Sequence, residues 1–168
     1  ERQLLAISPK ARLLSVDYGK NPKDYQAAPI KITFRYEIPD YALKGEGEMF
    51  FRPMVMNNLY NQVRSYMWID TSVENRKYGF KDGCSRLVEL DETIQLPAGY
   101  KLVSAAKDET MQGVGADFEG SLVQKGNKVL LHNRLALKKR VYEASDWESF
   151  RNAVNAHKAY GEYLVIKK

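Results

Sequence analysis

A strict alternation of apolar and polar residues constrains the fold of this chain more than any other feature. The apolar members are Ile30, Ile32, Phe34, Tyr36 and Ile38, and the residues between them are Lys31, Thr33, Arg35 and Glu37. Successive side chains of a strand point to opposite faces, so a period of two predicts a strand with one buried face. Pro29 opens this strand and Pro39-Asp40 closes it.

Two further alternations predict two more strands. One comprises Val88, Leu90, Ile94 and Leu96, and the other comprises Val129, Leu131, Leu135 and Leu137. Because polar residues lie largely between the apolar ones, these strands are of the antiparallel type, with one face uncovered. Weaker strand candidates are residues 13–18, 46–52, 66–71, 100–105, 116–123 and 163–167.

Turn residues separate the predicted strands. Pro97-Ala98-Gly99 lies between two of them, and Lys125-Gly126-Asn127 is typical of a hairpin. The stretch 53–64 fits neither period, and we interpret it as an irregular crossover with one helical turn.

One helix is predicted near the end of the chain. Ser145-Asp146-Trp147-Glu148 has the capping-box pattern, in which Ser145 and Glu148 each satisfy a free backbone N–H. Trp147, Phe150 and Val154 then recur at helical spacing, and Gly161 is a suitable stop.

These patterns together predict a mainly β fold. We expect an antiparallel β-sandwich with one C-terminal helix, at about residues 145–160, followed by a final strand. Residues 1–28 are interpreted as a linker and first strand, and residues 29–168 as a single β-sandwich domain.

Composition excludes several classes. The 168 residues are 44% hydrophobic and 28% charged, which is typical of a globular domain. No run reaches the roughly 18 apolar residues that a membrane helix needs. The net charge of +5 is partly due to Lys138-Lys139-Arg140 and Lys167-Lys168, and no aromatic-studded basic stripe predicts a nucleic-acid partner. Because the first residue is Glu1, we expect a processed or excised piece.

A cysteine hydrolase is one possible function. Cys84 is the single cysteine, and either His132 or His157 could act as its base. A reactive thiol needs an activating helix N-terminus or imidazolium nearby. Since a strand is predicted directly after Cys84, we interpret this cysteine as incidental.

Metal and cofactor sites are not predicted. Two histidines alone form no ligand set. The glycine pairs Gly113-x-Gly115 and Gly45-x-Gly47 lack the helix and lysine of a phosphate loop. The acidic pairs Asp91-Glu92 and Asp108-Glu109 would point to opposite faces of a strand, and so could not share a substrate.

Aromatic residues are the remaining hint of function, with 11 Tyr and 2 Trp. Trp147 fits the core, because it shares a helical face with Phe150 and Val154. Trp68 alternates with Tyr66, and this pair could be either core or an exposed platform for sugars or protein. They are the only binding candidates that the sequence offers.

Two blocks of sequence resemble a known family. One is the run from Pro29 to Ala42 with Met49-Phe-Phe-Arg-Pro53. The other combines Leu96-Pro-Ala-Gly-Tyr100, the Gly126-Asn-Lys128 hairpin, and a terminal strand-helix-strand that carries Tyr142, Trp147, Phe150 and Lys167. Over residues 11–168 the chain resembles the C-terminal domain of unknown function that follows the transglutaminase-like core of many exported bacterial proteins.

The resemblance implies that the catalytic Cys, His and Asp belong to an upstream papain-like core, for which this chain has no matching segment. It also implies export to the periplasm or cell envelope. Cys84 is not part of the family pattern. The expected partner is a transglutaminase-like core in the same parent chain, or a protein or cell-envelope substrate.

Three hypotheses follow. The first is a non-catalytic accessory domain that supports such a core or presents a binding surface. The second is a free-standing carbohydrate- or protein-binding module, and the third is a small cysteine enzyme that uses Cys84.

Overall fold

The structure is a computed structural model that describes residues 2–19, 31–56, 69–105 and 107–168. The chain divides into two compact units, Glu1–Tyr41 and Ala42–Lys168. The sequence predicts a domain that starts at residue 29, and the strand that follows Pro29 pairs with β1 within the first of these units.

The first unit contains a short helix and a two-stranded ribbon. These are α1 (Arg2–Ile7), β1 (Arg12–Asp17) and β2 (Thr33–Glu37), and the two strands pair antiparallel. Phe34 and Tyr36 are only half-buried, and Ile32 is 42% exposed. The alternation therefore predicted a strand correctly, but a lone ribbon leaves its apolar face partly exposed. The helix α1 was not predicted within the expected linker.

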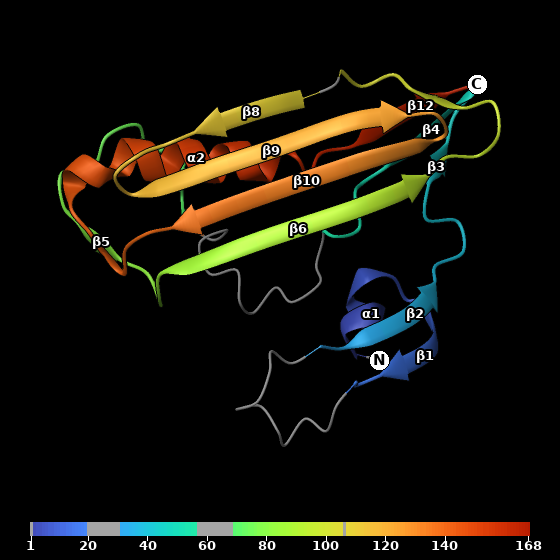
Figure 1. Cartoon of the computed structure of the whole chain (residues 1–168), viewed down its shortest axis with the longest axis horizontal. Helices are drawn as coiled ribbons and strands as arrows, with labels where there is room; N and C mark the ends of the chain where they lie inside the picture. The colour runs from blue at the N-terminus through green and yellow to red at the C-terminus, as the bar shows by residue number, and fades with distance from the viewer. Residues whose placement is uncertain (1, 20–30, 57–68, 106) are drawn as a thin grey trace. The chain divides into compact units, whose positions relative to one another are not determined.

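The second unit is mainly antiparallel β-structure, as predicted (Figure 1). Its elements are β3 (Leu43–Lys44), β4 (Glu48–Phe51), β5 (Phe80–Lys81), β6 (Arg86–Gln95), β7 (Lys101–Leu102), β8 (Lys107–Met111), β9 (Ala116–Lys125), β10 (Lys128–Leu137), β11 (Val141–Tyr142), a 3-10 turn (Ala144–Asp146), α2 (Trp147–Ala159) and β12 (Leu164–Lys167). One four-stranded sheet has the order β6-β10-β9-β8 and another has the order β3-β4-β12-β7, while β5 pairs with β11.

The long strands β6, β9 and β10, with β8 at the edge, form the sheet that carries the helix. β9 and β10 join through a two-residue turn, Gly126 and Asn127, as predicted. Along β10 every second residue is buried, from Val129 to Leu137. These residues face α2, which packs on β9 and β10. The apolar alternation in the sequence of β10 therefore marks the face of the sheet that α2 covers.

An aromatic cluster fixes the start of α2 in the core. Phe80 stacks on Tyr142 with ring centroids 4.7 Å apart, and Phe150 meets both rings edge-on at 4.9 Å. Trp147 is 2% exposed, and its indole N–H donates to the carbonyl of Val73 at 2.9 Å. The prediction that Trp147 and Phe150 belong to the core is confirmed.

The predicted capping box is wrong in its residues. The chain enters α2 through a 3-10 turn, and the Asp146 carboxylate accepts the backbone N–H of Glu143 at 2.8 Å. The capping interaction thus involves Glu143 and Asp146 instead of Ser145 and Glu148. The Asp side chain is the shorter and better placed acceptor once the helix is preceded by a 3-10 turn.

Two other predictions are settled only in part. Residues 69–71 form no strand, although 66–71 was a strand candidate, and residues 66–68 lie outside the described part of the chain. In the irregular crossover, residues 54–56 form a turn, and 57–64 also lie outside that part. The remaining weaker candidates correspond to β1, β4, β7, β9 and β12.

Candidate functional site

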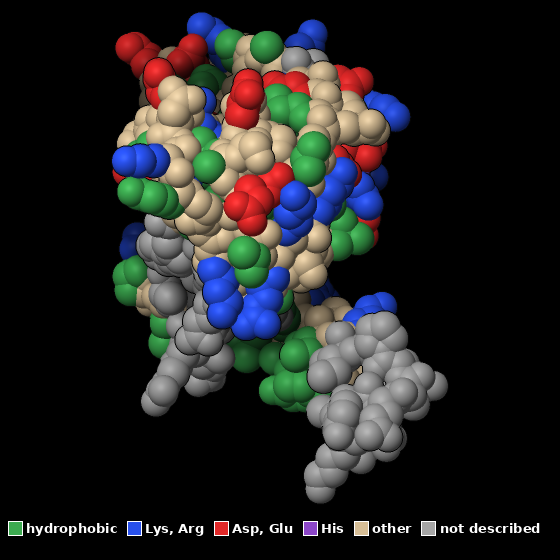
Figure 2. All heavy atoms as spheres, turned by 90° about the vertical axis from the view of Figure 1, so that its left-hand side faces the viewer, with side chains coloured by type: hydrophobic (Ala, Val, Ile, Leu, Met, Phe, Trp, Pro, Cys, Tyr) green, Lys and Arg blue, Asp and Glu red, His purple; other side chains and the backbone are tan. Residues whose placement is uncertain are grey.

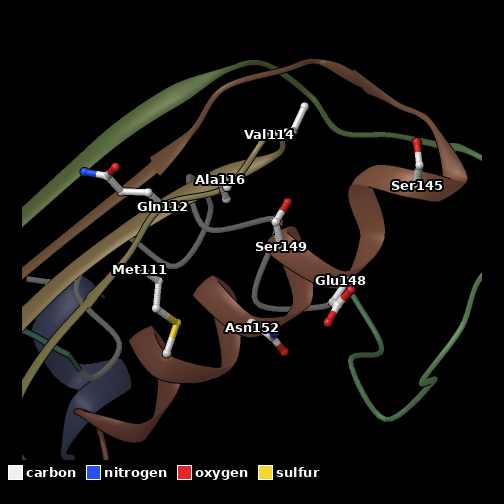
Figure 3. Close-up of a pocket in the computed structure, with 9 residues that line it drawn as sticks. Met111, Gln112, Val114, Ala116, Ser145, Glu148, Ser149 and Asn152 are labelled. Atoms are coloured by element: carbon white, nitrogen blue, oxygen red, sulfur yellow. The ribbon is translucent and has the colours of Figure 1, made fainter.

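A surface pocket of about 370 Å³ lies where the loop between β8 and β9 meets the first turns of α2 (Figure 3). The strand and loop contribute Met111, Gln112 and Val114, and the helix side contributes Ser145, Glu148 and Asn152. Met111 points toward α2, while Val114 is 70% exposed at the rim. The volume is within the range of small-ligand pockets.

The loop that shapes the pocket is fastened to the helix by Ser149. The Ser149 hydroxyl accepts the backbone N–H of Gly115 at 3.0 Å and donates to the carbonyl of Asp146. A Cβ on Gly113 would overlap the Cβ of Ser149, so this close approach requires glycine. The Gly113-x-Gly115 pair therefore lets the loop dock closely on α2.

Charges beside the pocket are mostly paired. Lys139 Nζ contacts Asp146 Oδ1 at 2.7 Å, and this hydrogen bond, with that from the Glu143 N–H, lowers the pKa of Asp146. Lys138 Nζ binds Asp117 at 2.7 Å and the carbonyl of Gly113 at 2.8 Å. Among the described residues that line the pocket itself, Glu148 is the only charged one.

The face of the sheet opposite α2 carries cross-strand charge pairs. His132 Nδ1 donates to Asp91 Oδ1 at 2.8 Å, and Arg134 Nε donates to Glu89 Oε1 at 3.1 Å. Directly opposed residues of neighbouring strands pair in this way in many sheets. His132 also lies opposite Ser121 in the ladder, but no hydrogen bond joins these two side chains. Because both His132 and Arg134 are paired with an acid on the neighbouring strand, this row has the form of a structural pairing.

Figure 2 shows the end of the molecule where β5 and the start of α2 lie. Acidic and basic side chains are interspersed over it, and no single basic patch dominates this view.

Cys84 is exposed in the segment that precedes β6. Asp91, the partner of His132, lies five residues into that strand from Arg86. At about 3.4 Å per residue this part of the strand spans roughly 17 Å. The two residues from Cys84 to Arg86 cannot close that gap, so His132 is beyond hydrogen-bond reach of the thiol.

His157 is buried in the core instead. Its exposure is 0%, and its Nδ1 donates to Asn133 Oδ1 at 2.6 Å. The Asn133 Nδ2 and the Tyr160 hydroxyl are buried without a hydrogen-bond partner among the described residues. A Cβ on Gly120 would lie 2.7 Å from Tyr160 Cζ, so glycine makes room for that ring.

Glu92 illustrates why adjacent acids on a strand cannot act together. Asp91 is exposed on the open face, while Glu92 lies on the covered face and accepts the backbone N–H groups of Met54 and Val55 at 3.1 and 3.0 Å. Burial raises the pKa of Glu92, and the two hydrogen bonds oppose that rise. This carboxylate therefore fastens the crossover to β6.

The two residues that the sequence singled out for binding, Tyr66 and Trp68, lie outside the described residues. Within the described ranges, no group of three His, Cys, Asp or Glu side chains could hold a metal ion. No helix in that same part of the chain is long and apolar enough to cross a membrane. The pocket beside α2 was not predicted, because it is made by a tertiary contact between two distant segments.

Comparison with known proteins gives one structural likeness. The fold is similar to part of a solved structure, that of a putative protease from Parabacteroides distasonis ATCC 8503, with a TM-score of 0.58 and 12% identity. The likeness covers 73% of this chain and 24% of that chain. This chain thus spans about a quarter of the length of its structural neighbour. No curated protein sequence matches it.

A family model gives the assignment. It describes a domain of unknown function with a solved structure, DUF3858, and it matches residues 47–165. The match lies entirely within the second compact unit, which begins at Ala42. The chain therefore belongs to the DUF3858 family of domains.

Proposed function

We propose that this chain is a non-catalytic accessory domain of a longer, exported bacterial protein with a transglutaminase-like core of papain-like fold. The observation that carries the proposal is the likeness to 24% of a longer chain that is described as a putative protease. A β domain of this kind needs to bury its sheet faces but needs no reactive site of its own. Its role is to support the core or to present a surface to a protein or cell-wall substrate.

The placement of the reactive side chains supports this role. Cys84 is exposed and His132 is tied to Asp91 beyond its reach, while the His157 ring is enclosed in the core. Cysteine catalysis requires the thiol and imidazole to be within hydrogen-bond reach.

The experiment is the substitution Cys84→Ala, with Ser85→Ala as the matched control. We expect both variants to keep the unfolding midpoint and any binding property of the parent chain, with only thiol labelling lost in the first. A robust hydrolase or transferase activity that disappears in Cys84→Ala alone would contradict the proposal and favour the small cysteine enzyme.

The position in a longer protein is tested separately. The gene region upstream of Glu1 should encode a segment with catalytic Cys, His and Asp, and limited proteolysis of the longer product should release the present domain. A signal peptide directly before Glu1 would instead favour a free-standing module.

Export to the periplasm or envelope is part of the same proposal. An alkaline phosphatase fusion to the complete gene product should be active in the producing bacterium, because that reporter works only outside the cytoplasm. An inactive fusion of normal abundance would contradict export.

A second candidate is a binding module that works alone, and the pocket beside α2 favours it. Titrating the isolated chain with glycans and, separately, with peptides shows which of these two classes of ligand it binds. Binding at full affinity by the isolated chain, with no gain from an attached core, would support this alternative.

A further inference from the structure

β8 lies at the edge of the sheet β6-β10-β9-β8, and its outer side is not paired with another strand in the described part of the chain (Figure 1). The hairpin register shows which backbone groups point outward. In a two-residue hairpin the residues that flank the turn, here Lys125 and Lys128, form a hydrogen-bonded pair. Odd-numbered residues of β9 therefore bond to β10, and even-numbered residues bond to β8.

The consequence for β8 follows from its own register. Glu109 lies opposite Gly120, and Met111 lies opposite Phe118, so both direct their backbone groups at β9. Asp108 and Thr110 direct their N–H and C=O groups away from the sheet. None of the hydrogen bonds among the described residues involves these outward groups, and both side chains are exposed. Such an edge can accept a further strand.

The pocket lies on the side of the sheet that an added strand would use. Met111 shares the covered face with buried Phe118, and Met111 also lines the pocket. A strand added at about 4.8 Å from β8 would send alternate side chains to this same face, along the flank of α2. There Glu148 and Asn152 form the helix wall of the pocket. Main-chain pairing would supply affinity and the pocket would select one side chain.

The charges indicate which side chain fits. Glu148 is the charged residue that lines the pocket, and Glu109 of β8 lies on the same covered face of the sheet as Met111. The nearest base on the strand, Lys107, donates to the carbonyl of Ala159 at 3.1 Å. An acidic wall with an apolar floor suits a long side chain that has an apolar stem and a cationic end.

We propose that β8 and the adjoining pocket form a docking site for an extended peptide, which adds as a strand to β8 and places a basic side chain against Glu148. The inference rests on the proposed function, because it names where the accessory domain would meet a protein partner. The docking site contains neither Cys84 nor Ser85, the two residues whose substitution tests the accessory role.

The probe is a blocked pentapeptide with lysine at its centre and threonine and valine on either side, titrated into the whole chain and followed by amide chemical shifts. We expect shifts concentrated at Asp108 to Met111 and at Glu148 and Asn152. The matched probe has norleucine in place of lysine, and it should bind about two- to fivefold more weakly, which is the range of one exposed charge pair.

Two substitutions separate the main-chain contact from the charge. Thr110→Pro removes an outward N–H, and proline is tolerated at a sheet edge, so binding should weaken about two- to tenfold, the equivalent of one hydrogen bond. Thr110→Val keeps that N–H and is the matched control. Glu148→Gln should remove the preference for lysine over norleucine, whereas Glu119→Gln, at an exposed position on β9, should preserve it.

Two results would each contradict the docking site at β8. Equal affinity of the two probes for the parent chain, or no shifts along β8 at millimolar peptide, would overturn the inference. If Thr110→Pro does not fold, the lysine preference and its loss in Glu148→Gln decide alone. Failure here leaves the accessory role intact, since that role is tested by Cys84→Ala and by the upstream sequence.

Discussion

Arg134 and Leu135 are neighbours in sequence, yet they lie on opposite faces of the same sheet. Leu135 is 0% exposed beneath α2, whereas the Arg134 side chain is 38% exposed and pairs with Glu89. Apolar surface buried on the covered face stabilises the fold by roughly 25 cal/mol per Å². Exposed ion pairs on the open face contribute little to stability. The difference teaches that the stability of the unit resides on one face, while the other face can change without loss of the fold.

Leu135→Ala should have the largest effect. It removes buried methyl groups and leaves a cavity between β10 and α2, so the free energy of unfolding should fall by about 2–5 kcal/mol. Urea denaturation followed by circular dichroism measures this loss. A change below about 1 kcal/mol would show that the covered face is not the source of stability.

Asn133→Ala tests the polar pair on the same covered face. It removes the acceptor of the buried His157 Nδ1–H, and an unmet buried donor costs about 1–3 kcal/mol. We expect a loss of that size by the same denaturation experiment. The matched control is Arg134→Ala on the open face. Equal effects of these two substitutions would contradict the contrast between the faces.

Tyr160→Phe tests how the stability of the covered face depends on pH. Burial, with the carboxylates of Glu109 and Asp108, raises the pKa of Tyr160 from 10.0 to about 12. The raised folded pKa means that neutral Tyr160 stabilises the native state fully below about pH 10, and this contribution is lost as the pH rises through about 12. The variant cannot ionise, so it should lose less stability than the parent between pH 9 and pH 11. Parallel urea titrations at the two pH values compare them, and identical losses would contradict the assignment.

Arg134→Ala should have the smallest effect. Its ion pair with Glu89 is exposed to solvent, and such pairs contribute about 0.2–1 kcal/mol. The small difference should shrink further in high salt, because exposed charges are screened. A salt-independent loss above about 2 kcal/mol would mean that the open face is buried by something in solution.

The long strands could be predicted from sequence because burial alternates over ten residues along β6 and β10. Strands of two residues, such as β3, β5 and β11, carry no period and were missed. The helix was predicted from the spacing of Trp147, Phe150 and Val154, which all face the core. Its cap was misassigned, because the capping pair is Glu143 and Asp146 at a 3-10 turn before α2, and the pattern of Ser145 and Glu148 does not reveal that turn.

The candidate site could not be predicted in the same way. The pocket depends on Ser149 meeting the Gly115 N–H, a contact across 34 residues of sequence. Local patterns carry no information about that contact. The sequence does show the pair Gly113 and Gly115, but a pair of glycines can have many structural roles and does not reveal a contact with Ser149.

β12 lies between β4 and β7, so the strand of this unit that comes last in the sequence is an inner strand of its sheet. Its Lys167 meets Glu48 across 119 residues of sequence. Such distant pairing slows folding, since a long loop must close before any contact is gained. While residues 164–167 are still inside the ribosome, β4 can pair only with the two-residue strand β3, and the place of β12 between β4 and β7 is empty. The sheet can therefore be completed only after residues 164–167 have left the ribosome, and a nascent chain halted before residue 164 should be a substrate for chaperones.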